Sequence, residues 1–287
     1  MEIVKTVNEV RNIVKSWQKE GLTVGFVPTM GYLHEGHQSL ITHAVSENDR
    51  VVVSIFVNPM QFGPTEDLAS YPRDLERDAA LCEVNGAALI FNPEPAEMYF
   101  PDFSTYVDME GLTEGLCGQS RPVHFRGVCT VVTKLFNIVQ PDRAYFGQKD
   151  AQQLAVIKQM VRDLNMAIEI VGCPIIREAD GLAKSSRNTY LNEEERKAAL
   201  VLSRSIRKGQ QLLEQGERNA HTIIEAMTAI IQAEPLAKID YIEAVDARSL
   251  KKVETFEHPV LVALAVYIGK TRLIDNFTYP EQLEEAK

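Results

Sequence analysis

The chain has 287 residues, a hydrophobic fraction of 45% and a formal net charge of −10 at pH 7. This length can bury a sizeable core and fits one large domain or two unequal ones. The acidic balance argues against broad binding to a nucleic-acid backbone. No run of about 18 apolar residues is present to span a bilayer, and the first residues alternate charged with apolar side chains instead of forming a signal-peptide core. We therefore expect a cytoplasmic protein with neither a nucleic-acid nor a membrane partner.

Four cysteines are widely spread along the chain and form no C-x-x-C pair. This spacing indicates neither a zinc knuckle nor a disulfide framework. We therefore expect buried free thiols. The four residues are Cys82, Cys117, Cys129 and Cys173.

The first 175 residues alternate helix-like with strand-like segments. Apolar residues at helical spacing, followed by Gly21, predict a first helix over residues 9–21. Strands that alternate with helices favour a parallel sheet with crossover connections, whose ligands lie beyond the carboxyl ends of the strands. The further predicted helices are 37–48, 71–86, 127–141 and 149–164, and the predicted strands are 22–28, 50–59, 87–93, 143–147 and 167–172.

The pattern changes near Ile175. A polar, loop-like segment is followed by a predicted helix that begins after Asn192. Asn192 is a good N-cap, and the first turn of the helix that follows it contains three acidic residues. We predict an α/β fold with a Rossmann-like parallel-sheet domain over residues 1–176 and a smaller α+β domain over residues 177–287. The loop-like segment is 175–192, the helices of this part are 193–216 and 220–233, and its strands are 239–247, 259–269 and 271–277.

The stretch FVPTMGYLHEGHQSL, residues 26–40, follows an apolar strand and leads into a helix. Gly31 and Gly36 permit a positive φ or the close approach of a ligand to the backbone. His34 and His37 are the side chains best able to exchange or share a proton near neutral pH. The combination predicts a ligand site at the carboxyl end of this strand.

The stretch is one residue type away from a P-loop, but His37 stands where the P-loop lysine would be, and no G-x-G-x-x-G is present. A dinucleotide oxidoreductase is therefore disfavoured. Two histidines three residues apart could be metal ligands, with His43 as the nearest third candidate, or incidental surface residues. We favour contact with phosphate at the start of a helix.

HEGH, after a strand and before a helix, resembles the His-x-Gly-His signature of the nucleotidyltransferase superfamily that includes class I aminoacyl-tRNA synthetases. LAKSSRN, residues 182–188, resembles the mobile Lys/Ser-rich loop of that superfamily. Four longer blocks are together similar to the pantothenate synthetase family, the pantoate–β-alanine ligases. These blocks are VPTMGYLHEGHQSL, SIFVNPMQFGPTEDLASYPRDLERD, RPVHFRGVCTVVTKLFNIVQPDRAYFGQKDAQQLAVIKQMVRDL and CPIIREADGLAKSSRNTYLN.

The resemblance implies a two-step reaction in the cytoplasm by a homodimer that uses Mg²⁺. Pantoate attacks the α-phosphorus of ATP to give pantoyl adenylate, and β-alanine then displaces AMP to form pantothenate. Because the first step adds negative charge to phosphate oxygens, catalysis needs positioned cations and donors. By family match the catalytic residues are His37 (the proton donor), His34, Lys149, Ser185, Ser186 and Arg187.

The same match implies an ATP site built from three segments. The first runs from the strand end into the helix and the second follows residues 143–147. The third is the KSSR sequence, in which Lys184 stands where many family members have Met. The implied ATP-binding residues are Met30, Gly31, Tyr32, Leu33, His34, Glu35, Gly36, His37, Gly147, Gln148, Lys149, Asp150, Ile176, Lys184, Ser185, Ser186 and Arg187.

Gln61 and Gln153 match the two amide ligands of pantoate in the family, and Gln61 is also expected to hold β-alanine. An amide both donates and accepts hydrogen bonds, which suits a hydroxy acid. Asp78 is a candidate to contact Mg²⁺ through water. The residues 124–126 are a candidate wall or dimer contact.

Two other functions stay open on the residues alone. A transferase of the same fold would leave the nucleotide on its product, and a regulator would bind ATP without turnover. A tRNA synthetase is disfavoured because the chain has no visible anticodon-binding extension or basic domain.

Overall fold

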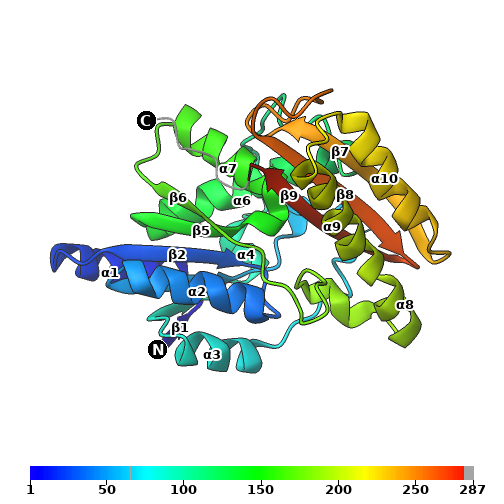
Figure 1. The fold of residues 1–287 in the computed structure, drawn as a ribbon. Coiled ribbons are helices and arrows are strands. Elements are labelled where there is room, and N and C mark those ends of the chain that lie inside the picture. The colour runs from blue at the N-terminus through cyan, green and yellow to red at the C-terminus, as the bar shows by residue number, and fades with distance from the viewer. Residues whose placement is uncertain (65, 281–287) are drawn as a thin grey trace. The chain divides into compact units, whose positions relative to one another are not determined.

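The computed structural model describes residues 1–64 and 66–280, which form two compact units. Unit 1 comprises residues 1–110, 121–148 and 153–174, and unit 2 comprises residues 111–120, 149–152 and 175–287. The main boundary therefore lies two residues before the predicted one at 176/177. Unit 2 also includes two short segments that the sequence pattern does not assign to it. The two units are described separately (Figure 1).

Unit 1 is built on a parallel sheet of six strands in the order β1-β4-β3-β2-β5-β6. The predicted Rossmann-like fold class is confirmed. The central strands read as continuous apolar runs because both faces of the sheet are covered. The strands are β1 Glu2–Val4, β2 Val24–Thr29, β3 Arg50–Ile55, β4 Leu89–Phe91, β5 Arg143–Gly147 and β6 Glu169–Cys173.

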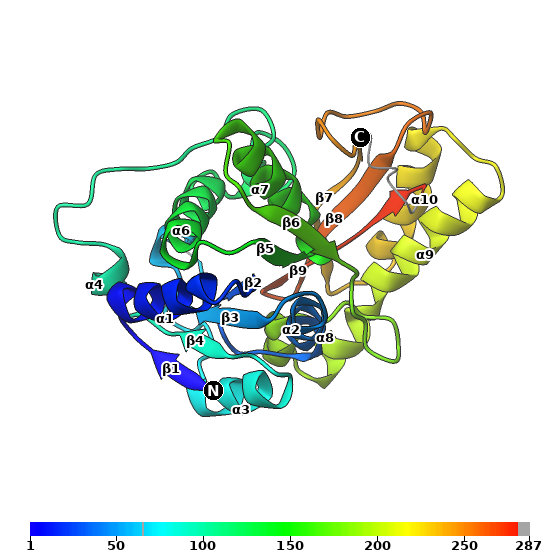
Figure 2. The same cartoon turned by 90° about the vertical axis from the view of Figure 1, so that its left-hand side faces the viewer.

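Helices cover both faces of this sheet (Figure 1 and Figure 2). One face carries α1 Val7–Lys19, α6 His124–Val139 and the unit 1 part of α7 Ala151–Asp163, and the other carries α2 Glu35–Glu47 and α3 Leu75–Val84. Apolar residues of α2 and α3 pack with inward residues of β2, β3 and β4 to form one core. Short elements are η1 Pro59–Gln61, α4 Pro95–Met98 and η2 Gln148–Asp150.

The topology of unit 1 selects one edge of its sheet for ligands. From β2 the chain moves through β3 to β4, and it then crosses to β5 on the other side of β2. In open parallel sheets, the point where the strand order reverses leaves a crevice beyond the carboxyl ends of the two strands. The turn after β2 and the residues after β5 lie at this edge.

Unit 2 is built on an antiparallel sheet of three strands, β7 Ala237–Asp246, β8 Val260–Ile268 and β9 Thr271–Tyr279. The helices α9 Leu200–Glu214 and α10 Ala220–Gln232 pack on one face through a large apolar cluster. A smaller cluster with Leu116 and Ala151 covers the other face. The remaining elements are α5 Cys117–Ser120, η3 Ser186–Tyr190 and α8 Glu193–Ala198.

The structure departs from the predicted elements in a few places. The predicted helix 193–216 is divided at Ala199 into α8 and α9, and the short strand β1 is not anticipated. Asn192 does cap α8, in a reciprocal capping box with Glu195. Three cysteines are buried as expected, whereas Cys117 is half-buried. Within the described residues, no helix is long and apolar enough to cross a membrane.

Candidate active site

The turn that follows β2 has an unusual backbone. Gly31 has a φ of +86° and Tyr32 a φ of +50°, so two successive residues lie in the left-handed region. That region is unfavourable for residues with a side chain. A Cβ atom on Gly31 would lie 2.9 Å from Ile55 Cγ2 and 3.1 Å from Asp78 Oδ2. The packing around this turn therefore requires glycine at position 31.

A buried carboxylate holds this turn. Asp78, on α3, is 1% exposed, and its two oxygens accept the N–H groups of Tyr32 and Leu33 at 2.7 Å each. Burial raises the pKa of Asp78 above its ordinary value, although the hydrogen bonds from Leu33 and Tyr32 oppose the increase. Asp78 is thus an internal anion that fixes the backbone between β2 and α2.

The two histidines of the motif cap α2 reciprocally. His34 is the N-cap and its Nδ1 accepts the N–H of Gly36 (3.1 Å), while His37 Nδ1 accepts the N–H of His34 (3.3 Å). The ring centroids are 4.1 Å apart. Because Nδ1 accepts a hydrogen bond in both rings, the ring proton of each neutral imidazole is on Nε2. Both Nε2–H groups are therefore donors at the positive end of a helix dipole.

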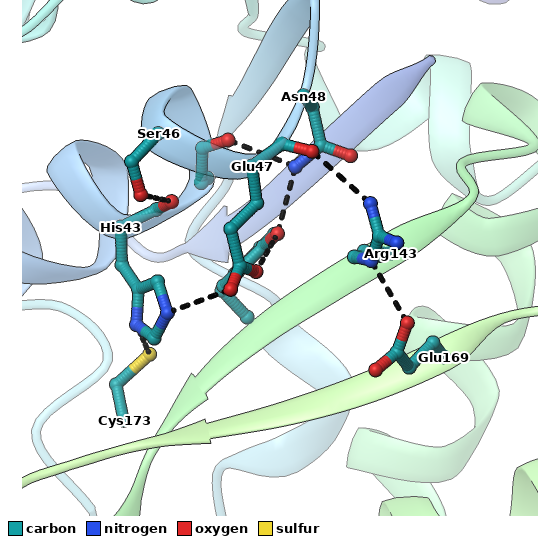
Figure 3. Close-up of polar contacts among 9 residues, drawn as sticks. His43, Ser46, Glu47, Asn48, Arg143, Glu169 and Cys173 are labelled. Atoms are coloured by element: carbon teal, nitrogen blue, oxygen red, sulfur yellow. Dashed lines mark hydrogen bonds and ion pairs between the residues drawn. The ribbon is translucent and has the colours of Figure 1, made fainter.

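The other end of α2 is fixed to the sheet by a polar network (Figure 3). Glu47 accepts the hydroxyl of Tyr145 at 2.7 Å, and Asn48 Nδ2 donates to the same hydroxyl at 2.7 Å. His43 lies 3.2 Å from Glu47 and 3.4 Å from Cys173 Sγ. The hydrogen bond from Tyr145, followed by that with His43, lowers the pKa of Glu47 against the effect of burial. His43 therefore belongs to this network, and α2 is anchored at both ends.

The loop after β3 brings Gln61 to the end of β2. Gln61 is buried, its Nε2 donates to Met30 Sδ at 3.3 Å, and its Oε1 accepts Asn58 Nδ2 at 3.1 Å. Asn58 is itself held by Gly127 O (3.1 Å) and by the hydroxyl of Tyr99 (2.7 Å). The amide of Gln61 is thus oriented, with its oxygen toward Asn58 and its nitrogen toward Met30.

The residues 124–126 have three different surroundings. His124 is buried, and its Nδ1 lies 3.1 Å from the carbonyl oxygen of Gln61. Phe125 is buried in the core of unit 1. Arg126 is exposed and lies over the ring of Tyr106, 4.0 Å from its centroid. His124 therefore supports the Gln61 loop, while the predicted dimer contact stays a prediction.

The sequence FGQKD is divided between the units. Gly147 ends β5 and Gln148 follows in unit 1, whereas Lys149 and Asp150 belong to unit 2. Lys149 Nζ lies 3.4 Å from Asp150 Oδ2, and the carbonyl of Lys149 accepts Asn276 Nδ2 at 2.8 Å. The backbone of Lys149 is therefore fixed to strand β9.

The KSSR sequence is more ordered than the predicted loop. The N–H of Lys184 donates to the carbonyl of Ile176 at 2.9 Å, which closes a small hairpin. Ser185 then caps η3, with its Oγ accepting the N–H of Arg187 at 3.3 Å. Ser186 is buried at the first position of η3. The cations and hydroxyls of this motif thus lie at a hairpin end and a capped short helix.

Two acidic residues of the same hairpin, 176–184, form hydrogen bonds with an arginine of α8. Arg196 donates to Glu178 at 2.7 Å and to Asp180 at 2.8 Å, and Asn188 donates to Glu178 at 3.0 Å. Burial works to raise the pKa of Asp180, but hydrogen bonds, including that from Arg196, bring it below its ordinary value. Side-chain contacts thus fix the hairpin that leads to Lys184.

Two adjacent glutamines at the start of α7 differ in their surroundings. Gln152 is buried in unit 2, where it accepts the N–H of Cys117 (2.9 Å) and donates to the carbonyls of Leu112 (2.8 Å) and Gly115 (2.9 Å). Gln153 is half-buried and belongs to unit 1. Gln152 is therefore structural, and the role of Gln153 toward pantoate stays a prediction.

Within the part of the chain that the structure describes, the side chains do not form a metal site by themselves. Among residues 1–64 and 66–280, no group of three or more His, Cys, Asp or Glu side chains is arranged to hold a metal ion. Both oxygens of Asp78 accept backbone N–H groups in a buried place. This geometry gives Asp78 a positioning role, and its contact with Mg²⁺ through water stays a prediction.

Asn58 and the structural role of Asp78 are not among the residues and roles predicted from the sequence. Asn58 directly precedes Pro59 beyond a buried strand, which marks it as a turn residue at the ligand-binding edge. Asp78 lies three residues after Leu75 and four before Cys82, so helical spacing places a carboxylate on the apolar face of α3. A carboxylate on the apolar face of a helix is therefore the feature of the sequence that indicates a structural role for Asp78.

Unit 1 thus presents a preformed turn, a helix N-terminus and two imidazole donors, and unit 2 presents two short segments with cations and hydroxyls. Donors of these kinds bind phosphate groups. The chain matches the model of the family "Pantoate-beta-alanine ligase" over residues 2–278. It is 67% identical over 279 residues to a pantothenate synthetase of Ruminiclostridium cellulolyticum, with 97% of this chain and 99% of that protein covered.

Solved structures give the same result. The pantothenate synthetase of Thermus thermophilus is 46% identical, with a TM-score of 0.91, and the match covers 96% of this chain and 99% of that one. The pantoate-beta-alanine ligase of Francisella tularensis, complexed with beta-gamma ATP and beta-alanine, is 36% identical with a TM-score of 0.78 and covers 96% and 97% of the two chains.

Proposed function

The chain belongs to the pantoate–β-alanine ligase family and condenses (R)-pantoate with β-alanine in an ATP-dependent reaction, and we propose that the candidate residues described above carry it out. In the first step, a carboxylate oxygen of pantoate attacks the α-phosphorus of ATP, and pyrophosphate leaves. In the second step, the amine of β-alanine attacks the acyl carbon of pantoyl adenylate and loses a proton. The bond from the acyl carbon to AMP breaks, and pantothenate forms.

One observation supports the assignment of the first step above all. The reciprocal cap directs Nδ1 of His34 and His37 to backbone N–H groups, so Nε2 carries the proton in each ring. We propose that these Nε2–H groups donate to phosphate oxygens of ATP as negative charge develops, together with the N-terminus of α2. His37 is the proposed proton donor of the pair.

The backbone of the turn completes the unit 1 part of the nucleotide site. Gly31 has no Cβ to meet Ile55 and Asp78, so the turn can adopt its left-handed conformation, and we propose that its backbone lies along the nucleotide. Gly147 and Gln148 follow β5, the strand beside β2 at the switch point. The proposed lining of ATP in unit 1 is Met30, Gly31, Tyr32, Leu33, His34, Glu35, Gly36, His37, Gly147 and Gln148.

Unit 2 supplies the cations in this proposal. Lys149 and Arg187 bind phosphate oxygens, and Arg187 does so in a bidentate manner. The hydroxyls of Ser185 and Ser186 donate to the same groups. Asp150, Ile176 and Lys184 line the nucleotide, with Ile176 offering its backbone to adenine.

The amide of Gln61 is the proposed anchor of pantoate. Its oxygen and nitrogen are oriented by Asn58 and Met30, so the side chain is pre-organised before the substrate arrives. An oriented amide can donate to the carboxylate of pantoate and accept from a hydroxyl. Gln153 is the second proposed amide ligand, and Gln61 also holds β-alanine.

Magnesium enters this proposal with the nucleotide. Mg²⁺ keeps several waters and is held by substrate phosphates with few protein carboxylates. The oxygens of Asp78 accept two N–H groups of the turn, so the residues of this chain fit a magnesium–ATP complex better than a protein-held ion. The chain's own part is to supply cations, imidazole donors and backbone N–H groups.

The assembly and the compartment are proposals as well. The family resemblance supports a cytoplasmic homodimer. Sedimentation equilibrium at several protein concentrations tests the assembly, and a single species with the mass of one chain would contradict it.

The direct test of the function is turnover with defined substrates. The protein, ATP and Mg²⁺ are incubated with D-pantoate and β-alanine, and AMP and pantothenate are measured. We expect AMP and pantothenate in equal amounts, each dependent on pantoate. Pantoate-dependent exchange of radioactive pyrophosphate into ATP, without β-alanine, isolates the first step.

The same assays separate the alternatives. A nucleotidyltransferase would release pyrophosphate without needing an amine and would leave the nucleotide on its product. A regulator would bind ATP with no pyrophosphate exchange at any pantoate concentration. Either result would overturn the proposed roles of the residues.

A further inference from the structure

Strand β9 carries two polar residues in the interior of unit 2. Asp275 and Asn276 are 2% and 5% exposed, at the centre of a strand that pairs with β8 along its whole length. Successive residues of a strand point to opposite faces of the sheet. A buried carboxylate and a buried amide are unfavourable unless each has hydrogen-bond partners. The identity of those partners indicates what the two residues do.

On the face that α9 covers, Asp275 binds the hairpin of the KSSR segment. Arg177 forms a bidentate pair with Asp275, with N–O distances of 2.7 and 2.8 Å, and also donates to the carbonyl of Gly181 at 3.1 Å. Arg177 pairs with Ala183 across the hairpin, and the next backbone contact is made by Lys184. The ion pair thus fixes the hairpin one residue before the KSSR sequence.

On the opposite face, Asn276 binds the second cationic segment. Its Nδ2 donates to the carbonyl of Lys149 at 2.8 Å. Lys149 is 127 residues away in sequence. It lies in the short segment 149–152, whose Ala151 packs on this face of the sheet. The hydrogen bond therefore attaches the backbone of Lys149 directly to β9.

We propose that Asp275 and Asn276 are positioning residues for adenylate formation. Two adjacent positions of one hydrogen-bonded strand hold Lys149 and the KSSR hairpin, so these two cationic segments keep a fixed spacing within unit 2. Neither residue acts on the substrate itself; each acts through the segment that it holds. The inference rests on the proposed phosphate-binding roles of Lys149 and Arg187.

The geometry makes a specific kinetic prediction. The β- and γ-phosphates leave as pyrophosphate in the first step, so groups that hold them stabilise the transition state of that step alone. Loss of the fixed spacing is therefore expected to slow adenylate formation much more than the attack of β-alanine on adenylate already formed. A general loss of stability would instead reduce both steps together.

The experiment compares Asp275→Asn and Asn276→Ser with Asp240→Asn. Asp240→Asn is the matched control. It breaks the Arg272–Asp240 ion pair of the same sheet, and neither of these two residues forms a hydrogen bond or ion pair with either cationic segment. Each variant is assayed below its melting temperature for pantoate-dependent pyrophosphate exchange. Each is also assayed for AMP release from supplied pantoyl adenylate with β-alanine.

We expect pyrophosphate exchange to fall about 10- to 100-fold in both β9 variants, as for a catalytic group displaced by about 1 Å, with AMP release within about 2-fold of wild type. The control variant should melt earlier and keep both rates. Unchanged exchange in folded Asn276→Ser, or equal loss of both steps in proportion to lost stability, would overturn the inference. If Asp275→Asn does not fold, Asn276→Ser decides alone. Wild-type protein without pantoate-dependent exchange would refute the proposed function instead.

Discussion

The two units hold their candidate phosphate-binding segments by different means. In unit 1, the turn from Met30 to His34 is fixed through its backbone, by left-handed residues, a reciprocal cap and the carboxylate of Asp78. In unit 2, the hairpin 176–184 is fixed largely through ion pairs of long side chains, from Arg177 and Arg196.

The difference has consequences for rigidity. Backbone hydrogen bonds in a buried place are hardly screened by salt, so the unit 1 turn is preformed for its ligand. Ion pairs with partly exposed members are weaker and are screened by salt. Regions held by such contacts open locally at lower free energy than the core. We therefore expect unit 1 to supply fixed donors. In the unit 2 hairpin, the part that Arg196 holds through Glu178 and Asp180 should be the more adjustable, while the buried Asp275 keeps the end at Arg177 in place.

The largest expected effect comes from a substitution that tests the roles of the two ring nitrogens of His37 separately. In His37→Asn, the amide oxygen replaces Nδ1 as acceptor of the His34 N–H, but nothing replaces Nε2. We expect the rate of pyrophosphate exchange to fall by about 10²-fold or more, because a donor to the developing charge is lost. The melting temperature should stay near that of wild type, because the cap is kept.

His37→Ala is the matched control for this experiment. It loses Nε2 and the cap together, so the same fall in rate should come with about 1 kcal/mol lower free energy of unfolding. If His37→Asn formed pantoyl adenylate at the wild-type rate in a single-turnover experiment, the imidazole would serve only the helix cap.

The second prediction removes the internal anion of unit 1. Asp78→Ala leaves the N–H groups of Tyr32 and Leu33 without their acceptor in a buried place. We expect the free energy of unfolding to fall by about 1–3 kcal/mol, measured by urea denaturation. The KM for ATP should rise as the turn loses its fixed conformation. An unchanged KM in the folded variant would mean that the turn keeps its shape without Asp78.

The regular elements of both units could be predicted from the sequence because they depend on local patterns. Largely apolar runs such as residues 51–55 identify buried parallel strands, and the Gly31 to His37 pattern marks the turn and the helix start. The three residues of β1 are too few for any periodicity to appear. The division at Ala199 interrupts a pattern that is helical on both sides of it.

The candidate site was only partly predictable for a different reason. Motifs locate His34, His37 and Gln61, but the contacts that hold them come from residues distant in sequence. Asn276 and Lys149 are 127 residues apart, and no local pattern joins them. Such pairs depend on the register of the finished sheet, so they become visible only in the folded structure.

The third prediction tests the hairpin of unit 2. Arg196→Gln removes the cation shared by Glu178 and Asp180, of which Asp180 is the more exposed. We expect faster amide hydrogen exchange across residues 176–184 and a stability loss of about 1 kcal/mol or less, because such pairs are partly screened. In wild type, salt at about 0.5 M should accelerate exchange in this hairpin and leave the unit 1 turn unchanged. If salt accelerated amide exchange equally in the hairpin and in the unit 1 turn, the proposed difference in how the two units hold their segments would be contradicted.

The smallest expected effect concerns the far end of α2 and depends on pH. The hydroxyl of Tyr145 is the largest cause of the lowered pKa of Glu47. A carboxyl with a lowered pKa stabilises the fold above its ordinary pKa, and this contribution is lost as the pH falls through the lowered value. Tyr145→Phe should therefore lower the free energy of unfolding by about 0.5–1 kcal/mol at pH 7 and by less in acid, where Glu47 is protonated. Denaturation curves at several pH values measure the difference, and a loss independent of pH would assign it to the contact with Asn48 rather than to Glu47.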